Sequence, residues 1–258
     1  MTAISVISTS NAADLGYLAL ADVAASGLDP RTYRIVGGHM VQLLIHVYPT
    51  PEATERSTAD ADAGIDRATA VGQDLHLHLL GSGYEATSGN RYVKKDPAGG
   101  ERAVDLLIPH GTVGEPEQVN GRGFDAIPGL GFALTASPLL VDAKVLLRNG
   151  TDMEFTVPVP NVESALILKA LAWKSRASEK DLTDISSLLE ITQRHKVNLS
   201  GWGFDDSRRA ERGSRKDAAF ALHLVRDRLE RGFIKAGAAV RQPARLSALI
   251  NAHIPSVR

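Results

Sequence analysis

The chain has 258 residues, no cysteine and a hydrophobic content of 43%, which suits one large or two modest globular domains with a buried core. Without cysteine, disulfide frameworks, thiolate metal sites and cysteine nucleophiles are excluded. The start of the sequence lacks the basic region of a signal peptide, and no apolar run approaches the length that spans a bilayer. We therefore expect a soluble cytoplasmic protein without a membrane partner.

The net charge of −1 hides two oppositely charged parts. Residues 1–164 carry 11 Lys and Arg against 20 Asp and Glu, a net charge of −9, whereas residues 165–258 carry 18 against 10, a net charge of +8. Acidic sites attract metal ions, and basic surfaces attract polyanions such as RNA. By itself, the asymmetry is explained equally well by two solvated faces without a function.

Up to residue 160, strand-like runs alternate with helical stretches. The run YRIVGG predicts a strand that ends in Gly37 and Gly38, and HMVQLLIHVY predicts a helix after it. A strand of small residues holds Asp60 and Asp62, and residues 65–85 predict one helix that glycines stop. The runs RYVKK and RAVDLLIP flank DPAGGE as a hairpin, and GFALTAS, AKVLLRN and MEFTVPV predict further strands of one mixed sheet.

After residue 160 the pattern becomes helical. Apolar residues recur at helical spacing in NVESALILKALAWKSR, SEKDLTDISSLLEITQRH, KDAAFALHLVRDRLERGF and PARLSALINAH. Ser178 and Asp181 have the spacing of a capping box, and a polar loop rich in arginine lies between the second and third of these helices. We predict an α+β protein with a mixed-sheet domain at 1–160 and a helical, basic domain at 161–258.

The pair Asp60 and Asp62 is the first chemical signal. Alternate side chains of a strand share a face, so these two project together while Ala61 points the other way. Neighbouring carboxylates repel, a cost tolerated where a divalent cation lies between them, and oxygen ligands suit Mg²⁺ or Mn²⁺. Asp105 interrupts the apolar run AVDLLIP and is a third candidate ligand. Each feature alone has a structural alternative, a loop D-x-D or an aspartate on an edge strand.

The glycine pair Gly37 and Gly38 is the second signal. It stands where a strand gives way to a helix, so backbone N–H groups and the positive end of the helix could closely approach a phosphate. Glycines in such turns are also used for backbone geometry alone.

In this order, the motifs resemble the nucleotidyltransferase superfamily typified by DNA polymerase beta, and within it the AbiEii and MenT-type toxins of bacterial toxin–antitoxin systems. The likeness rests on Gly37, Gly38, Thr58, Asp60, Asp62 and Asp105. The segment VPNVESALILKALAWKSRASEKDLTDISSLLE is similar to that group's helical part, in which a lysine and an arginine precede K-D-x-x-D. The resemblance covers roughly residues 33–190.

The resemblance implies a mechanism. The D-x-D pair would hold two Mg²⁺ ions, or Mn²⁺, that bridge the triphosphate of a nucleotide, and Asp105 would complete the second metal site and help to deprotonate the attacking hydroxyl. Gly37, Gly38 and Thr58 would lie near the nucleotide, and Lys169 would contact its phosphates, supported by Arg176 and Asp184. The implied partners are a nucleoside triphosphate, an RNA acceptor such as a tRNA 3′ end, and an antitoxin protein.

The helical residues have structural alternatives. Lys169, Trp173 and Arg176 share a helix face, which could be a cationic rim above an apolar stripe. Asp181 reads as a helix cap, and Asp184 could be an exposed acid paired with Lys180.

The glycine motif departs from the family pattern, since many members have Gly-Ser where this chain has two glycines, followed by His39. A hydroxyl that would touch phosphate is therefore missing. His76 and His78 are two residues apart on a predicted helix and do not share a face, so we expect structural roles.

A basic cluster follows in the arginine-rich loop. It could track an RNA backbone, or it could be a solvated loop. Its members are Arg208, Arg209, Arg212, Arg215 and Lys216.

Three functions remain open: a toxin that transfers nucleotides to RNA, a transferase acting on a small molecule such as an aminoglycoside, and a catalytically inactive nucleic-acid-binding relative.

Overall fold

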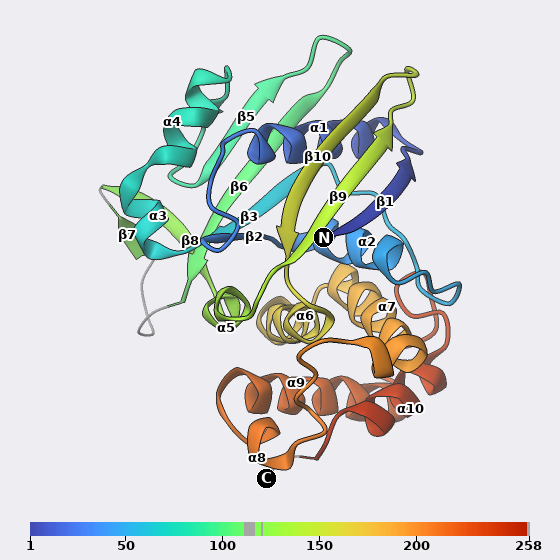
Figure 1. Ribbon diagram of the computed structural model, residues 1–258. Coiled ribbons are helices and arrows are strands. Elements are labelled where there is room, and N and C mark those ends of the chain that lie inside the picture. The colour runs from blue at the N-terminus through green and yellow to red at the C-terminus, as the bar shows by residue number, and fades with distance from the viewer. Residues whose placement is uncertain (111–116, 120, 257–258) are drawn as a thin grey trace. The chain divides into compact units, whose positions relative to one another are not determined.

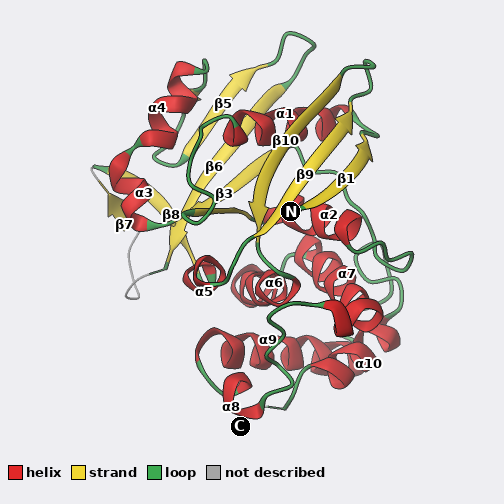
Figure 2. Cartoon of the chain, in the orientation of Figure 1, coloured by secondary structure: helices red, strands yellow, loops and turns green. Residues whose placement is uncertain are grey.

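The structure is a computed structural model that describes residues 1–110, 117–119 and 121–256. Its mixed sheets with flanking helices and a helical C-terminal region confirm the expected α+β class (Figures 1 and 2). Within these ranges, no helix combines the length and the apolar composition needed to cross a membrane.

The chain divides into two compact units. The first comprises Met1–Val47 and Arg56–Pro160, and the second comprises Tyr48–Glu55 and Asn161–Arg258. No pattern in residues 48–55 indicated that they would pack with the helical unit. They do so through contacts such as the 3.0 Å hydrogen bond from the Thr54 N–H to the Ser187 hydroxyl.

The first unit holds all the strands that the structure describes. The strands are β1 (Thr2–Ile7), β2 (Tyr33–Ile35), β3 (Asp60–Ile65), β4 (Glu85–Ala86), β5 (Arg91–Lys95), β6 (Glu101–Pro109), β7 (Glu117–Val119), β8 (Arg122–Ile127), β9 (Leu139–Leu146) and β10 (Asp152–Val159). The helices of this unit are α1 (Asn11–Ala24), α2 (Gly37–Val47), α3 (Arg67–Gly72), α4 (Asp74–Gly81) and α5 (Leu130–Thr135).

These strands form separate hydrogen-bonded sheets rather than the single mixed sheet that the sequence suggested. One sheet has the order β1-β9-β10, and the other has the order β2-β3-β6-β5-β4, with β8 pairing β6 and β7 pairing β8. The expectation was wrong because β9 pairs in parallel with β1, an N-terminal strand that was not predicted, and antiparallel with β10. In the larger sheet, β3 and β6 are parallel neighbours.

Helix α1 fills the core on one side of the larger sheet. It contacts β3, β6 and β10, and its side chains Tyr17, Leu20 and Val23 are fully buried. Ser10 caps the helix by accepting a hydrogen bond from the Ala13 N–H at 3.1 Å. Helix α1 thus covers one side of β3 and β6.

Two local predictions were wrong. Residues 65–85 form α3 and α4 instead of one helix, because Gln73 adopts a left-handed φ of 62° between them and Asp66 caps α3 through the Thr69 N–H at 2.7 Å. The run GFALTAS contains helix α5 instead of a strand. This helix begins after Gly129, whose φ is 85°, and buries Leu130.

The second unit is helical. Its helices are α6 (Val162–Arg176), α7 (Glu179–His195), the 3₁₀ turn η1 (Lys196–Asn198), α8 (Ser207–Ala210), α9 (Gly213–Glu230) and α10 (Pro243–His253). Helix α6 packs against α7 and α9, and α10 packs against α7 and α9. Asn161 caps α6 by accepting from the Ser164 N–H at 2.9 Å, whereas Ser178, at the N-cap of α7, makes no side-chain cap bond. Helix α8 lies within the predicted polar loop.

Candidate active site

Three aspartates share one face of the larger sheet. Asp60 and Asp62 on β3 alternate with the fully buried Ala61 and project away from α1. The parallel pairing of β3 with β6 sets Asp62 directly opposite Asp105. Since paired residues on neighbouring strands point to the same side, the D-x-D pair and the isolated strand aspartate belong to one acidic face.

Arg91 bridges two of these carboxylates from a third strand. The antiparallel pairing of β5 with β6 places it opposite Asp105. Its Nη1 donates a 2.7 Å hydrogen bond to Asp105 Oδ2, and its Nη2 lies 3.6 Å from Asp60 Oδ1. The guanidinium therefore supplies positive charge where the resemblance leads us to expect cations.

Asp105 carries the clearest electrostatic perturbation of the face. Burial raises the pKa of its carboxyl above the ordinary value, Asp60 and Asp125 raise it further, and Arg91 only partly opposes them. Asp125 lies on β8 opposite Leu107 and accepts a 3.0 Å hydrogen bond from the Asn90 amide. Asp105 can therefore hold a proton at a higher pH than an exposed carboxyl can.

The glycine pair lies against the same acids. Gly37 opens α2 with a φ of 64°, and a Cβ at this position would overlap the Asp62 carboxylate. A Cβ on Gly38 would lie 2.9 Å from Arg56 Nη2 and 3.1 Å from Thr58 Cβ. The structure thus brings the predicted glycines, Thr58 and Asp62 together at the N-terminal end of a helix, where backbone N–H groups favour anions.

His39 is a buried support for this region. Its Nδ1 lies 3.1 Å from the Asp60 carbonyl oxygen, to which it can only donate, and its Nε2 has no hydrogen-bond partner in the described part of the chain. Burial lowers the pKa of His39 to about 4, and the charge of Arg56 adds to this effect. The imidazole is therefore neutral at pH 7 and serves the backbone of β3 rather than a phosphate.

The donor chemistry of the acidic face fits a hard divalent cation, because carboxylates from neighbouring strands supply oxygen ligands alone. As the side chains stand, the described residues contain no group of three acidic or histidine side chains that could hold a metal ion together. The guanidinium of Arg91 spans Asp60 and Asp105 instead.

In the second unit, the predicted nucleotide-binding residues belong to an ionic cluster in which Lys169, Asp181 and Asp184 are buried and Arg176 is exposed. Lys169 Nζ lies 2.6 Å from Asp184 Oδ2 and 3.7 Å from Asp181 Oδ1. Arg176 donates two hydrogen bonds, of 2.7 and 2.8 Å, to the Asp181 carboxylate. Asp184 is therefore buried against Lys169 instead of exposed beside Lys180, and Asp181 binds side chains instead of capping α7.

The basic cluster is not uniform. Arg208, Arg209, Arg212 and Lys216 are exposed. Arg215, by contrast, donates hydrogen bonds of 3.1 and 2.7 Å to the buried carboxylate of Glu163. Arg215 thus differs from the other four predicted RNA contacts, because it is bound to a buried residue of the helical unit.

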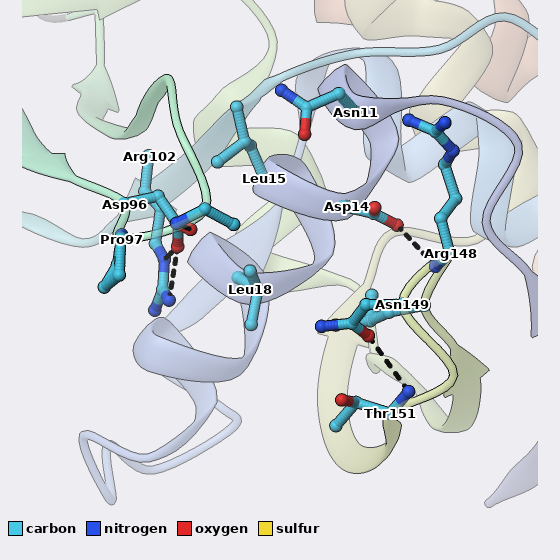
Figure 3. Close-up of a pocket in the computed structure, with 12 residues that line it drawn as sticks. Asn11, Asp14, Leu15, Leu18, Asp96, Pro97, Arg102, Arg148, Asn149 and Thr151 are labelled. Atoms are coloured by element: carbon cyan, nitrogen blue, oxygen red, sulfur yellow. Dashed lines mark hydrogen bonds and ion pairs between the residues drawn. The ribbon is translucent and has the colours of Figure 1, made fainter.

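A separate pocket of about 510 Å³ lies at the tips of two hairpins (Figure 3). Its walls come from α1, the β5–β6 turn and the β9–β10 turn, and Figure 3 shows Arg102 joined to Asp96. Arg102 also pairs with Asp22 on α1 at 3.1 Å. Because Arg102 and Asp105 lie an odd number of residues apart on β6, the pocket and the acidic face lie on opposite sides of the sheet.

His76 and His78 have structural partners, as expected. The His76 Nδ1 lies 2.7 Å from the Tyr92 hydroxyl, and the His78 Nε2 lies 2.8 Å from the Asp22 carbonyl oxygen.

Searches for similar proteins add no assignment, because no protein-family model and no curated protein match the chain.

Several residues around the site were not predicted from the sequence, namely Asn90, Arg91 and Asp125 on the acidic face and Arg56 beside Gly38. A usable signal existed for Arg91. The hairpin around DPAGGE pairs Lys95 with Glu101, and counting outward from this pair brings Arg91 opposite Asp105. For Asp125, nothing in the sequence indicated that β8 would pair with β6.

Proposed function

We propose that the first unit is the catalytic domain of a metal-dependent nucleotidyltransferase. The observation that carries the proposal is the register of β3 and β6, which sets Asp62 opposite Asp105 with Gly37 in contact with Asp62. A D-x-D pair, a third strand aspartate and a glycine-led helix N-terminus thus share one site. This combination suits a substrate that is a phosphate chain with its divalent cations.

In the proposed reaction, a hydroxyl of the acceptor attacks the α-phosphorus of a nucleoside triphosphate, a new P–O bond forms, and pyrophosphate leaves. Bound Mg²⁺ or Mn²⁺ would be held by Asp60, Asp62 and Asp105 and would supply charge stabilisation to the phosphates. The N–H groups at the start of α2 would receive phosphate oxygens. Asp105, whose pKa is raised by burial, is suited to accept the proton of the attacking hydroxyl.

The acceptor that we propose is RNA, with a tRNA 3′ end as the specific target. The net charge of +8 on residues 165–258 supports a polyanionic acceptor. The proposed role as a toxin with an antitoxin partner rests on the resemblance to the AbiEii and MenT-type group.

The test is to incubate the purified protein with each labelled nucleoside triphosphate, Mg²⁺ and total tRNA, and then with an aminoglycoside as the acceptor. We expect label in RNA, lost in Asp62→Asn and retained in Asp142→Asn, a matched change on a strand of the other sheet. Label on the small acceptor alone would favour the small-molecule transferase. Equal labelling by the wild type and Asp62→Asn would reject the catalytic assignment.

A further inference from the structure

We infer that Arg91 is an exchangeable counter-ion of the acidic face. It neutralises Asp60 and Asp105 in the free protein, and it transfers to the phosphates when a nucleotide arrives with its divalent cations. This inference rests on the proposed nucleotidyltransferase function. It assigns to Arg91 the role of setting the net charge of the same site.

The first support is geometric. Arg91 comes from β5, whereas the carboxylates that it contacts come from β6 and β3, at 2.7 Å to Asp105 and 3.6 Å to Asp60. One guanidinium thus cross-links two of the three proposed metal ligands. A cation that bound the same oxygens would be repelled by the guanidinium, so metal binding and the Arg91 pairs compete.

The second support is the freedom of the side chain. Arg91 is 39% exposed, whereas Arg102, one strand away, is 15% exposed and held between Asp96 and Asp22. Arg102 is thus fixed in the fold, but Arg91 can leave its partners without opening the core.

The third support is the chemistry of the ligand that would replace the carboxylates. A guanidinium pairs with phosphate oxygens through two parallel N–H bonds as readily as with a carboxylate. A bound triphosphate therefore gives Arg91 an equivalent partner when the aspartates bind the metal ion. Asp125, opposite Leu107 on the same face, adds a carboxylate beyond the two that Arg91 contacts.

The first measurement is calorimetric titration of Mn²⁺ into the full-length protein without nucleotide. Arg91→Gln should bind Mn²⁺ about three- to tenfold more tightly than the wild type in 50 mM KCl, and the difference should shrink in 500 mM KCl. The matched control is Lys95→Gln, which removes a charge from the same face of β5 and should stay within about twofold of the wild type. Asp62→Asn should lose Mn²⁺ binding.

The second measurement is the affinity for a non-hydrolysable nucleoside triphosphate at saturating Mn²⁺. Arg91→Gln should bind it about tenfold more weakly because the phosphate loses a charged bidentate partner. Melting temperatures in EDTA report whether each variant folds. If Arg91→Gln does not fold, Arg91→Lys replaces it, with Mn²⁺ affinity within about twofold of the wild type and weaker nucleotide binding.

The outcomes separate the two proposals. If the wild type and Arg91→Gln bind Mn²⁺ equally, the counter-ion role is overturned and the metal site stands. Tighter Mn²⁺ binding with unchanged nucleotide affinity would overturn the transfer of Arg91 to phosphate. Absence of Mn²⁺ binding in every protein, the wild type included, would overturn both proposals.

Discussion

Asp62 on β3 stands opposite Asp105 on β6 in a parallel pair of strands. Two carboxylates on one face of neighbouring strands repel each other, and folding alone offers no reason to place them there. Arg91 offsets part of the repulsion, yet the pKa of Asp105 stays raised. The arrangement therefore lowers the stability of the folded protein, as functional sites often do, and this loss of stability can be measured.

Asp105→Asn should raise the thermal stability at neutral pH and abolish nucleotide transfer. Because the pKa of Asp105 is raised in the folded protein, the ionised carboxyl is less favourable there than in the unfolded chain, so its cost grows as the pH rises through the folded pKa. Melting temperatures should favour Asp105→Asn at pH 7 and converge with the wild type as the pH falls towards 3.8, the ordinary value. Transfer should fall by more than about a hundredfold. A lower melting temperature at pH 7 with unaltered transfer would contradict both parts.

Gly37→Ala should damage the site far more than Gly38→Ala. At Gly37 a side chain must adopt a φ of 64° and displace the Asp62 carboxylate, whereas at Gly38 it meets only the flexible end of Arg56 and Thr58. A displacement of about 1 Å at a reacting group can cost about a hundredfold in rate, and the left-handed backbone adds about 1–2 kcal/mol of strain. Rates of transfer and melting temperatures of the two variants, measured side by side, check this. Equal rates would show that Asp62 needs no such placement.

How far the sequence predicts this site depends on the range of the interactions. Alternation along β3 correctly placed Asp60 and Asp62 on one face, because that rule needs only neighbouring residues. The pairing of β3 with β6 joins distant segments, and no local pattern encodes its register. Arg91 was within reach through the hairpin turn, but Asp125 depends on the pairing of β8 with β6.

The stability of the first unit should fall between pH 6.5 and pH 4 through His39. Its pKa of about 4 in the folded protein lies below the ordinary 6.5, so the unfolded chain binds a proton that the folded protein does not. The contribution of the neutral imidazole is complete above pH 6.5 and decreases by up to roughly 3 kcal/mol as the pH falls towards 4. Urea unfolding across this range should show a shallower pH dependence in His39→Asn, which retains a donor for the Asp60 carbonyl. A slope unchanged in His39→Asn would refute the assignment.

The errors in the fold prediction have a physical origin as well. The apolar residues of the run GFALTAS are compatible with a short helix or with a strand. The left-handed conformation of Gly129, just before the run, starts a helix here. In the same way, Gln73 takes a conformation that its residue type rarely adopts, so a break between α3 and α4 could not be read from propensity. The long helices α6, α7 and α9 were predicted well because many turns repeat the same apolar spacing.

Arg215→Gln and Arg212→Gln should separate folding from RNA binding. Arg215 is bound to the buried Glu163, so its loss should destabilise the second unit by about 3 kcal/mol. Arg212 is exposed, so its loss should leave the melting temperature unchanged and lower the slope of log affinity for tRNA against log salt by about 1. Thermal melts and fluorescence anisotropy over a KCl series measure the two effects. An unchanged salt slope in Arg212→Gln would argue against this loop as the RNA contact.

Lys169→Met should destabilise the second unit whatever its effect on catalysis. Lys169 is buried between Asp184 and Asp181 at 2.6 and 3.7 Å. Its removal leaves buried carboxylates with less positive charge, at a cost of about 3–5 kcal/mol. Asp181 retains Arg176, so most of the penalty should fall on Asp184.

The double variant Lys169→Met, Asp184→Asn tests this origin of the loss. Because the second change removes the buried carboxylate that loses its Lys169 partner in the first, the double variant should be more stable than Lys169→Met alone in urea unfolding. Nucleotide transfer should then be assayed at a temperature at which both variants are folded. If the double variant regains stability but transfers no nucleotide, the Lys169–Asp184 pair acts in the reaction as the family resemblance implies; if it transfers at the wild-type rate, the pair serves only the fold. Equal stability of Lys169→Met and the wild type would refute the buried ion pair itself.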